Sequence, residues 1–172
     1  MVETHINLSI NRLLNEDTYA IPLYQRNFAW TYNEIEQLLN DVADAFQENR
    51  DNYYIGTLVV NKENDIFKII DGQQRTTALN LIALALKHEF GFDSLKAVNL
   101  TFPARKKSNK NIQDLFAKKK ILEGDENELT RGYGHARDAL KKVLEERQLN
   151  PQSFVNYLFE KVIIFRSILP ED

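Results

Sequence analysis

The stretch at residues 68–86, KIIDGQQRTTALNLIALAL, decides the fold because it joins a buried strand to a buried helix. Apolar β-branched residues come before Asp71, which is typical of a strand. From about Gln74 to Phe90, apolar side chains cover most of a helix circumference, so this helix is expected to be buried nearly all round. Gly91 is expected to end it. Five polar residues, DGQQR, occupy the joint between the two elements.

The polar joint combines residue types that suit an anion site. A helix N-terminus offers unpaired N–H groups and a partial positive charge. Gly72 lets a bound group approach the backbone, and Arg75 adds a planar cation that suits phosphate. Asp71 either caps the helix or holds hydrated Mg²⁺. The joint indicates a nucleotide phosphate site, with an ordinary Asp-Gly turn as the alternative. A P-loop is excluded because the Gly-Lys-Ser/Thr ending is absent.

A second cluster lies upstream in residues 21–30, IPLYQRNFAW. Pro22 favours an edge strand or an ordered loop. Tyr24, Gln25 and Arg26 are followed by two further aromatic residues, and aromatic rings beside cations suit a base or a phosphate. The alternative is that the rings belong to the core and Arg26 pairs with a surface acid.

The remaining chain predicts a hairpin and several helices. Residues 53–61 and 65–71 form the expected hairpin, and Thr31 with Glu34 has the capping-box spacing of a helix that continues to about Phe46. The other predictions are helical turns at 10–16, a strand at 97–102, a polar loop at 103–111, helices at 112–120 and 128–148 interrupted at Gly124, Gly132 and Gly134, a helix from Pro151 capped by Asn150, and a final apolar strand at 162–169.

The composition limits the function classes. The chain has 172 residues, 43% hydrophobic residues and a net charge of −3, which suits a globular fold and argues against a generic basic nucleic-acid binder. The basic residues between Arg105 and Lys120 either contact DNA phosphates or are solvated and paired with nearby acids. No cysteine is present, so disulfides and thiolate metal sites are excluded. Neither a secretion signal nor an apolar run long enough for a bilayer is seen, so a cytoplasmic protein without membrane contact is expected.

Three segments together carry a family resemblance: IPLYQRNFAW, YYIGTLVV and IIDGQQRTTAL, in this order and at this spacing. Over about residues 21–86 they resemble the N-terminal domain of GmrSD-type modification-dependent restriction endonucleases, a family of the ParB/sulfiredoxin-like superfamily. The resemblance implies an α+β fold, with a small mixed sheet and a central hairpin flanked by helices. Residues 1–100 would form the ParB-like nucleotide-binding core, and residues 101–172 a mainly helical continuation that ends in a strand.

The resemblance also implies a site. Gly56 and Thr57 match the middle motif, although close backbone packing explains a strand glycine equally well. Asp71 would hold Mg²⁺ or position water, and Gln73 or Gln74 would orient the attacking water. The implied catalytic residues are Asp71, Gln73, Gln74 and Arg75, and the implied nucleotide-binding residues are Tyr24, Gln25, Arg26, Gly56, Gly72 and Thr76.

The implied function is a nucleotide-binding, NTP-hydrolysing regulatory domain of a phage-defence restriction protein, with GTP, ATP or CTP and Mg²⁺ as ligands. The alternatives are a nucleotide switch without turnover and a DNA-sensing module partnered with a separate HNH nuclease. The three scattered histidines do not form an HNH cluster, so nuclease activity is not expected of this chain alone. The natural chain is expected to continue past Asp172 towards a nuclease domain or subunit, through which it would act on DNA; an oligomer is left open.

Overall fold

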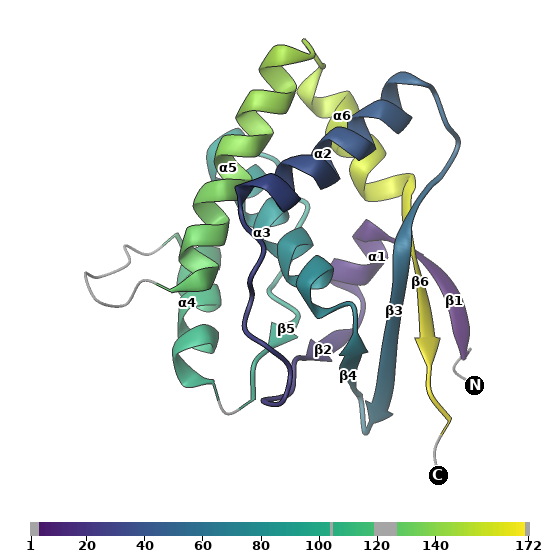
Figure 1. The fold of residues 1–172 in the computed structure, drawn as a ribbon, viewed down its shortest axis with the longest axis vertical. Coiled ribbons are helices and arrows are strands. Elements are labelled where there is room, and N and C mark those ends of the chain that lie inside the picture. The colour runs from purple at the N-terminus through teal and green to yellow at the C-terminus, as the bar shows by residue number, and fades with distance from the viewer. Residues whose placement is uncertain (1–3, 104, 119–126, 171–172) are drawn as a thin grey trace.

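The computed structural model describes residues 4–103, 105–118 and 127–170. These residues form a six-stranded sheet with a set of helices packed against it (Figure 1). The predicted α+β class is confirmed. The strands are β1 (His5–Ser9), β2 (Thr18–Ala20), β3 (Tyr53–Glu63), β4 (Ile66–Asp71), β5 (Leu100–Thr101) and β6 (Val162–Ile168). The helices are α1 (Ile10–Asn15), α2 (Tyr32–Gln47), α3 (Gln73–Phe90), α4 (Lys106–Phe116), α5 (Glu128–Glu146) and α6 (Pro151–Glu160).

The sheet is mixed, and its strand order is β1-β6-β3-β4-β2-β5. The predicted hairpin of β3 and β4 is antiparallel and lies at the centre. β6 joins β3 in parallel and β1 antiparallel, while β2 runs parallel to both β4 and β5. The strand nearest the C-terminus therefore lies between β1 and the hairpin, so both halves of the chain build one sheet.

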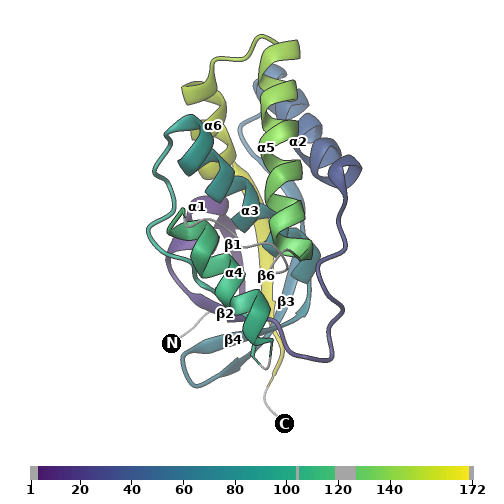
Figure 2. The same cartoon turned by 90° about the vertical axis from the view of Figure 1, so that its left-hand side faces the viewer.

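The helix α3 occupies the middle of the helical layer (Figure 2). Every residue from Thr76 to Leu86 is buried, as the apolar circumference of this segment predicts. α5 packs against both α3 and α2, and α4 packs against α5. α3 follows β4 after the single residue Gly72, so its first turn lies next to the end of β4.

Several predicted helix ends are confirmed. Thr31 and Glu34 form the capping box at the start of α2. Gly91 adopts a left-handed conformation with φ of 76° after α3, and the Asn150 side chain accepts a hydrogen bond from the N–H of Ser153 at the start of α6. In each case a local feature satisfies a helix terminus, either a capping side chain or a glycine backbone, so the signal was readable in the sequence.

Other predictions were wrong. The predicted polar loop at 103–111 is helical from Lys106, because Ile112 and Leu115 give α4 a buried side. Gly132 and Gly134 do not interrupt α5, which is continuous through both. The predicted strand at 97–102 pairs only over β5, and β1 was not predicted at all. The predicted break at Gly124 lies outside the described residues.

The final strand carries a buried charge that its apolar appearance did not suggest. Arg166 is 5% exposed and donates hydrogen bonds to Asp17 Oδ2 at 2.7 Å and to the Tyr19 hydroxyl at 2.8 Å. Burial raises the pKa of Tyr19 to about 12, so the hydroxyl stays neutral. This network links β6 to the start of β2. Within the described part of the chain, none of the helices has the length and apolar character needed to cross a membrane.

Candidate functional site

The joint between β4 and α3 has an open helix start. Gly72 is the N-cap, with a left-handed φ of 105°, and no side chain caps this end of α3. A Cβ at Gly72 would lie 3.2 Å from the carbonyl oxygen of Thr57, so close packing on β3 leaves little room for a side chain here. Asp71 therefore does not act as the helix cap. The backbone N–H groups of the first turn of α3 are left for another partner.

Arg75, in the first turn of α3, lies over Gly56. A Cβ at Gly56 would be 2.5 Å from Arg75 Nη1, and Gly56 has a φ of 131° where the pairing of β3 with β6 shifts register. Arg75 Nε is buried without a hydrogen-bond partner. No carboxylate in the described ranges pairs with the guanidinium of Arg75. A guanidinium held in place by packing but not neutralised is suited to an anion.

The loop at residues 21–31, between β2 and α2, is held by side chains from two other segments and by one of its own side chains bonded to β4. Gln74 accepts a hydrogen bond from the Ala29 N–H at 2.8 Å and donates one to the Asn27 carbonyl at 3.0 Å. Gln25 donates to the Ile70 carbonyl at 2.9 Å. Arg105 donates to the carbonyls of Leu23, at 2.9 Å, and Gln25. These bonds hold the loop beside the first turn of α3.

A pocket of about 220 Å³ lies at this junction. It is lined by Arg26 and Trp30 from the loop and by the five residues of the DGQQR joint: Asp71, Gly72, Gln73, Gln74 and Arg75. The structure therefore brings together six of the residues chosen from the sequence. Two arginines, an exposed carboxylate and an uncapped helix start share one cavity, which is a set of groups able to bind a polyanion and its counter-cation.

Four other residues chosen from the sequence do not line this pocket. The Tyr24 side chain is 70% exposed, and the Gln25 amide is bonded to β4. Thr76 is buried, and its hydroxyl donates to the Gly72 carbonyl at 2.9 Å. Gly56 meets the guanidinium of Arg75 and does not itself line the cavity. The close contact at Gly56 is therefore with the guanidinium of Arg75.

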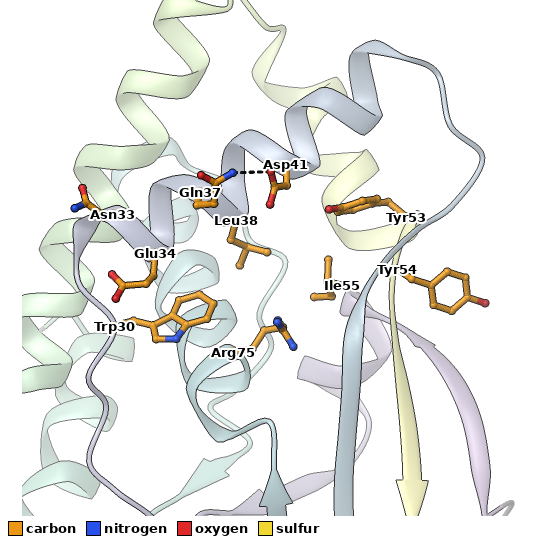
Figure 3. Close-up of a pocket in the computed structure, with 10 residues that line it drawn as sticks. All are labelled: Trp30, Asn33, Glu34, Gln37, Leu38, Asp41, Tyr53, Tyr54, Ile55 and Arg75. Carbon is orange, nitrogen blue, oxygen red and sulfur yellow. Dashed lines mark hydrogen bonds between the residues drawn. The ribbon is translucent and has the colours of Figure 1, made fainter.

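A second pocket of about 420 Å³ lies between α2 and β3 (Figure 3). Trp30 and Arg75 line both pockets, so the two cavities adjoin at these side chains. Sequence reasoning missed this pocket because the acidic residues of α2 look like an ordinary solvated helix face. The two consecutive tyrosines at the start of β3, Tyr53 and Tyr54, were the sequence feature that could have indicated a binding surface here. The other lining residues are Asn33, Glu34, Gln37, Leu38, Asp41, Tyr53, Tyr54 and Ile55.

Electrostatic surroundings differ between the two walls of this second pocket. Hydrogen bonds from the Thr31 side chain and backbone hold the pKa of the Glu34 carboxyl below its ordinary value, so it is charged at neutral pH. Burial raises the pKa of Tyr53, so its hydroxyl stays protonated. The α2 wall is thus anionic, the β3 wall is aromatic and neutral, and Arg75 is the one cation among the lining residues.

The described residues contain no group of three or more histidine, aspartate or glutamate side chains arranged to hold a metal ion. Asp71 is the single carboxylate that lines the smaller pocket. Mg²⁺ commonly binds through one or two carboxylates together with substrate phosphates and waters. Asp71 therefore suits a Mg²⁺ ion that arrives with a phosphate ligand, and it does not form a separate metal cage.

Comparison with known proteins gave one family match. The model described as GmrSD restriction endonuclease, N-terminal domain, matches residues 10–169, which is nearly the whole chain. A search of curated proteins gave no match.

Proposed function

The chain belongs to the family of GmrSD restriction endonuclease N-terminal domains, and from this premise we propose that it is the nucleotide-binding, NTP-hydrolysing regulatory domain of a modification-dependent restriction protein. The family gives the restriction context. The nucleotide is inferred from the chemistry of the pocket at the β4–α3 joint.

The observation that carries the proposal is that the guanidinium of Arg75 is placed in the pocket without an acidic partner among the described residues. Its guanidinium lines the pocket, has no acidic partner in the described residues, and stands at the uncapped first turn of α3. An unpaired arginine beside free helix N–H groups binds phosphate oxygens well, because the fork makes two charge-assisted hydrogen bonds. Arg26 lines the same pocket and adds a second cation for a polyphosphate.

The two glutamines have different roles in this proposal. The oxygen and the nitrogen of the Gln74 side-chain amide are both bonded to the loop backbone, so Gln74 acts as a positioning residue. Gln73 lines the pocket, and its side chain has no hydrogen bond to any other described residue. Gln73 is therefore the amide that orients the attacking water, while the arginines neutralise charge that develops on the transferring phosphoryl group.

Asp71 completes the site at the end of β4. It is exposed and lies on the opposite flank of Gly72 from the helix. A bound Mg²⁺ would supply positive charge that neutralises part of the phosphate charge. Asp71 would hold that ion through one carboxylate, or accept a hydrogen bond from a water next to the phosphates.

A nucleotide switch without turnover is the second candidate. One observation favours it: the pocket has a single carboxylate and no second general base among its described lining residues.

DNA sensing through the basic stretch has less support, because Arg105 is bonded to the loop and Lys110 pairs with Asp114 at 3.1 Å. The downstream nuclease partner remains part of the proposal.

The test is nucleotide binding by calorimetry, with GTP, ATP and CTP, in the presence and absence of Mg²⁺. Arg75→Ala is expected to weaken binding by about tenfold or more, since a charge-assisted hydrogen bond contributes ~1.5–3 kcal/mol. Arg12→Ala is the matched control, because Arg12 is an exposed arginine of α1 whose partner is Glu16, the residue that follows this helix. Equal affinity in folded Arg75→Ala, or no binding by the wild type, would contradict the proposal. Release of inorganic phosphate then separates hydrolysis from a switch.

A further inference from the structure

The larger pocket has the size and lining of a small-molecule site. Its volume of about 420 Å³ falls within the ~300–1,000 Å³ typical of ligand pockets. Trp30, Leu38 and Ile55 supply apolar surface, and Tyr53 projects into the space from β3 (Figure 3). Aromatic rings and aliphatic side chains around a cavity suit a flat heterocycle, because stacking contributes ~1–3 kcal/mol per base.

The rim along α2 offers mainly hydrogen-bond acceptors. Gln37 Nε2 donates to Asp41 Oδ1 at 2.8 Å, which leaves Asp41 Oδ2 without a bond to another described residue. Glu34 Oε2 accepts hydrogen bonds from the backbone N–H and the hydroxyl of Thr31, so Oε1 is the Glu34 oxygen that can accept a bond from a ligand. Glu34, Gln37 and Asp41 lie on successive turns of one helix face, as Figure 3 shows. A ligand that fills this pocket must therefore present donors towards α2.

The two ends of the combined cavity have opposite charge. Carboxylates lie on the α2 side, and Arg75 lies where the larger pocket adjoins the proposed phosphate pocket. A ligand with donor groups at one end, a flat middle and an anionic tail matches this order of groups. A nucleoside triphosphate whose base carries an exocyclic amino group has that arrangement.

We propose that the pocket between α2 and β3 receives the nucleoside part of the nucleotide, and that Glu34 and Asp41 select bases with an exocyclic amino group. The proposal rests on the proposed nucleotide function. Carboxylates accept hydrogen bonds from amino groups and repel carbonyl oxygens, as in contacts of Asp and Glu with the cytosine amino group. A base with a carbonyl in the same place loses a bond and gains a repulsive contact.

The experiment uses pairs of nucleotides that differ at this group. CTP and UTP also differ at ring N3, which accepts a hydrogen bond in cytosine and donates one in uracil, so the GTP and ITP pair isolates the amino group. CTP carries an amino group where UTP carries a carbonyl, and GTP carries an amino group that ITP lacks. The wild-type chain is expected to bind the amino-bearing member of each pair about tenfold more tightly, as expected for a hydrogen bond to a charged group. Equal affinities within both pairs would overturn the proposal.

Variants assign the selectivity to the rim. In Glu34→Gln/Asp41→Asn the CTP-to-UTP affinity ratio is expected to fall close to one, because each amide presents a donor as well as an acceptor. Gln keeps the capping-box geometry at position 34. Asp44→Asn is the matched control, since Asp44 is on the same helix, pairs with Arg147 at 2.8 Å and does not line the pocket. An unchanged ratio in the double variant would overturn the assignment.

Inorganic triphosphate and 2′-deoxy-CTP distinguish the remaining outcomes. Inorganic triphosphate should bind through the phosphate pocket, lose affinity in Arg75→Ala and keep it in the double variant. If no nucleotide and no triphosphate binds, the proposed function itself fails. If CTP binds no more tightly than triphosphate, or if only the 2′-hydroxyl matters, the phosphate site stands and the nucleoside inference is wrong.

Discussion

At the scale of single residues, Arg75 and Gly56 form the contact on which the proposed site depends. The guanidinium lies directly against the Gly56 backbone, where any Cβ would meet Nη1 at 2.5 Å. Gly56 is exposed, so the space left by its missing side chain accommodates Arg75 and not a core residue. The backbone of Gly56, at φ of 131°, is one that residues with a Cβ rarely adopt. The backbone conformation of Gly56 and the position of the Arg75 side chain are therefore coupled.

We expect Gly56→Ala to displace the guanidinium of Arg75 and lower nucleotide affinity about tenfold, the loss of one charge-assisted hydrogen bond. The strained backbone should also cost ~1–3 kcal/mol of unfolding free energy. Gly91→Ala is the control, because Gly91 also has a positive φ of 76° but nothing lies within 4 Å of an added Cβ. Both variants should lose stability, and only Gly56→Ala should lose affinity; loss of affinity in both would contradict a specific role for the Gly56–Arg75 contact.

At the scale of elements, the site is made where a loop is tied to a helix start. The adjacent residues Gln73 and Gln74 have different surroundings, because successive helix residues point in directions about 100° apart. Gln74 is 8% exposed and bonded to the loop, while Gln73 faces the pocket. The sequence alone could not assign these roles, since both residues are glutamine.

Gln74→Ala is expected to lower the free energy of unfolding by ~1–3 kcal/mol, because it leaves the Ala29 N–H without its partner. Amide hydrogen exchange at Ala29 should become faster. Gln73→Ala should change stability by less than ~0.5 kcal/mol, as surface substitutions usually do. It should instead slow phosphate release while leaving nucleotide affinity close to wild type. The reverse pattern, with Gln73→Ala unstable and Gln74→Ala stable, would show that the two roles are exchanged.

The elements differ in how far sequence reasoning could reach. Helix ends with Thr31 or Asn150 were predictable, because capping is local. The DGQQR joint was predictable as a strand-to-helix unit because the apolar patterns on either side of it are local. The role of Arg105 was not, because it depends on loop carbonyls about 80 positions away in the chain. The larger pocket was also missed, since its walls come from α2 and β3 and no single motif marks it.

At the scale of the whole molecule, α5 packs closely against the two segments that carry the proposed site, the loop at residues 21–31 and α3. Gly132 of α5 lies against Phe28 of the loop and Leu81 of α3. A Cβ there would come within 2.6 Å of the Phe28 ring and 2.7 Å of Leu81 Cδ1. Three segments that are distant in sequence therefore meet at one glycine. The Arg166 network similarly joins β6 to Asp17 and Tyr19 at the start of β2.

We expect Gly132→Ala to destabilise the protein by ~1–3 kcal/mol through overpacking, although alanine is the better helix former. Gly134→Ala, two residues further along α5, has open space apart from an arginine tip at 3.7 Å. It should gain up to ~1 kcal/mol, the difference in helix propensity between the two residues. Chemical denaturation measures both changes. Stabilisation by Gly132→Ala would mean that α5 and the loop do not pack as closely as described.

The most direct test of the central claim is a crystal structure of the chain with a non-hydrolysable nucleoside triphosphate and Mg²⁺. The account predicts phosphate oxygens within hydrogen-bond distance of the Arg75 guanidinium and of the first backbone N–H groups of α3. A triphosphate bound at any other surface, with Arg75 still without an anionic partner, would contradict it.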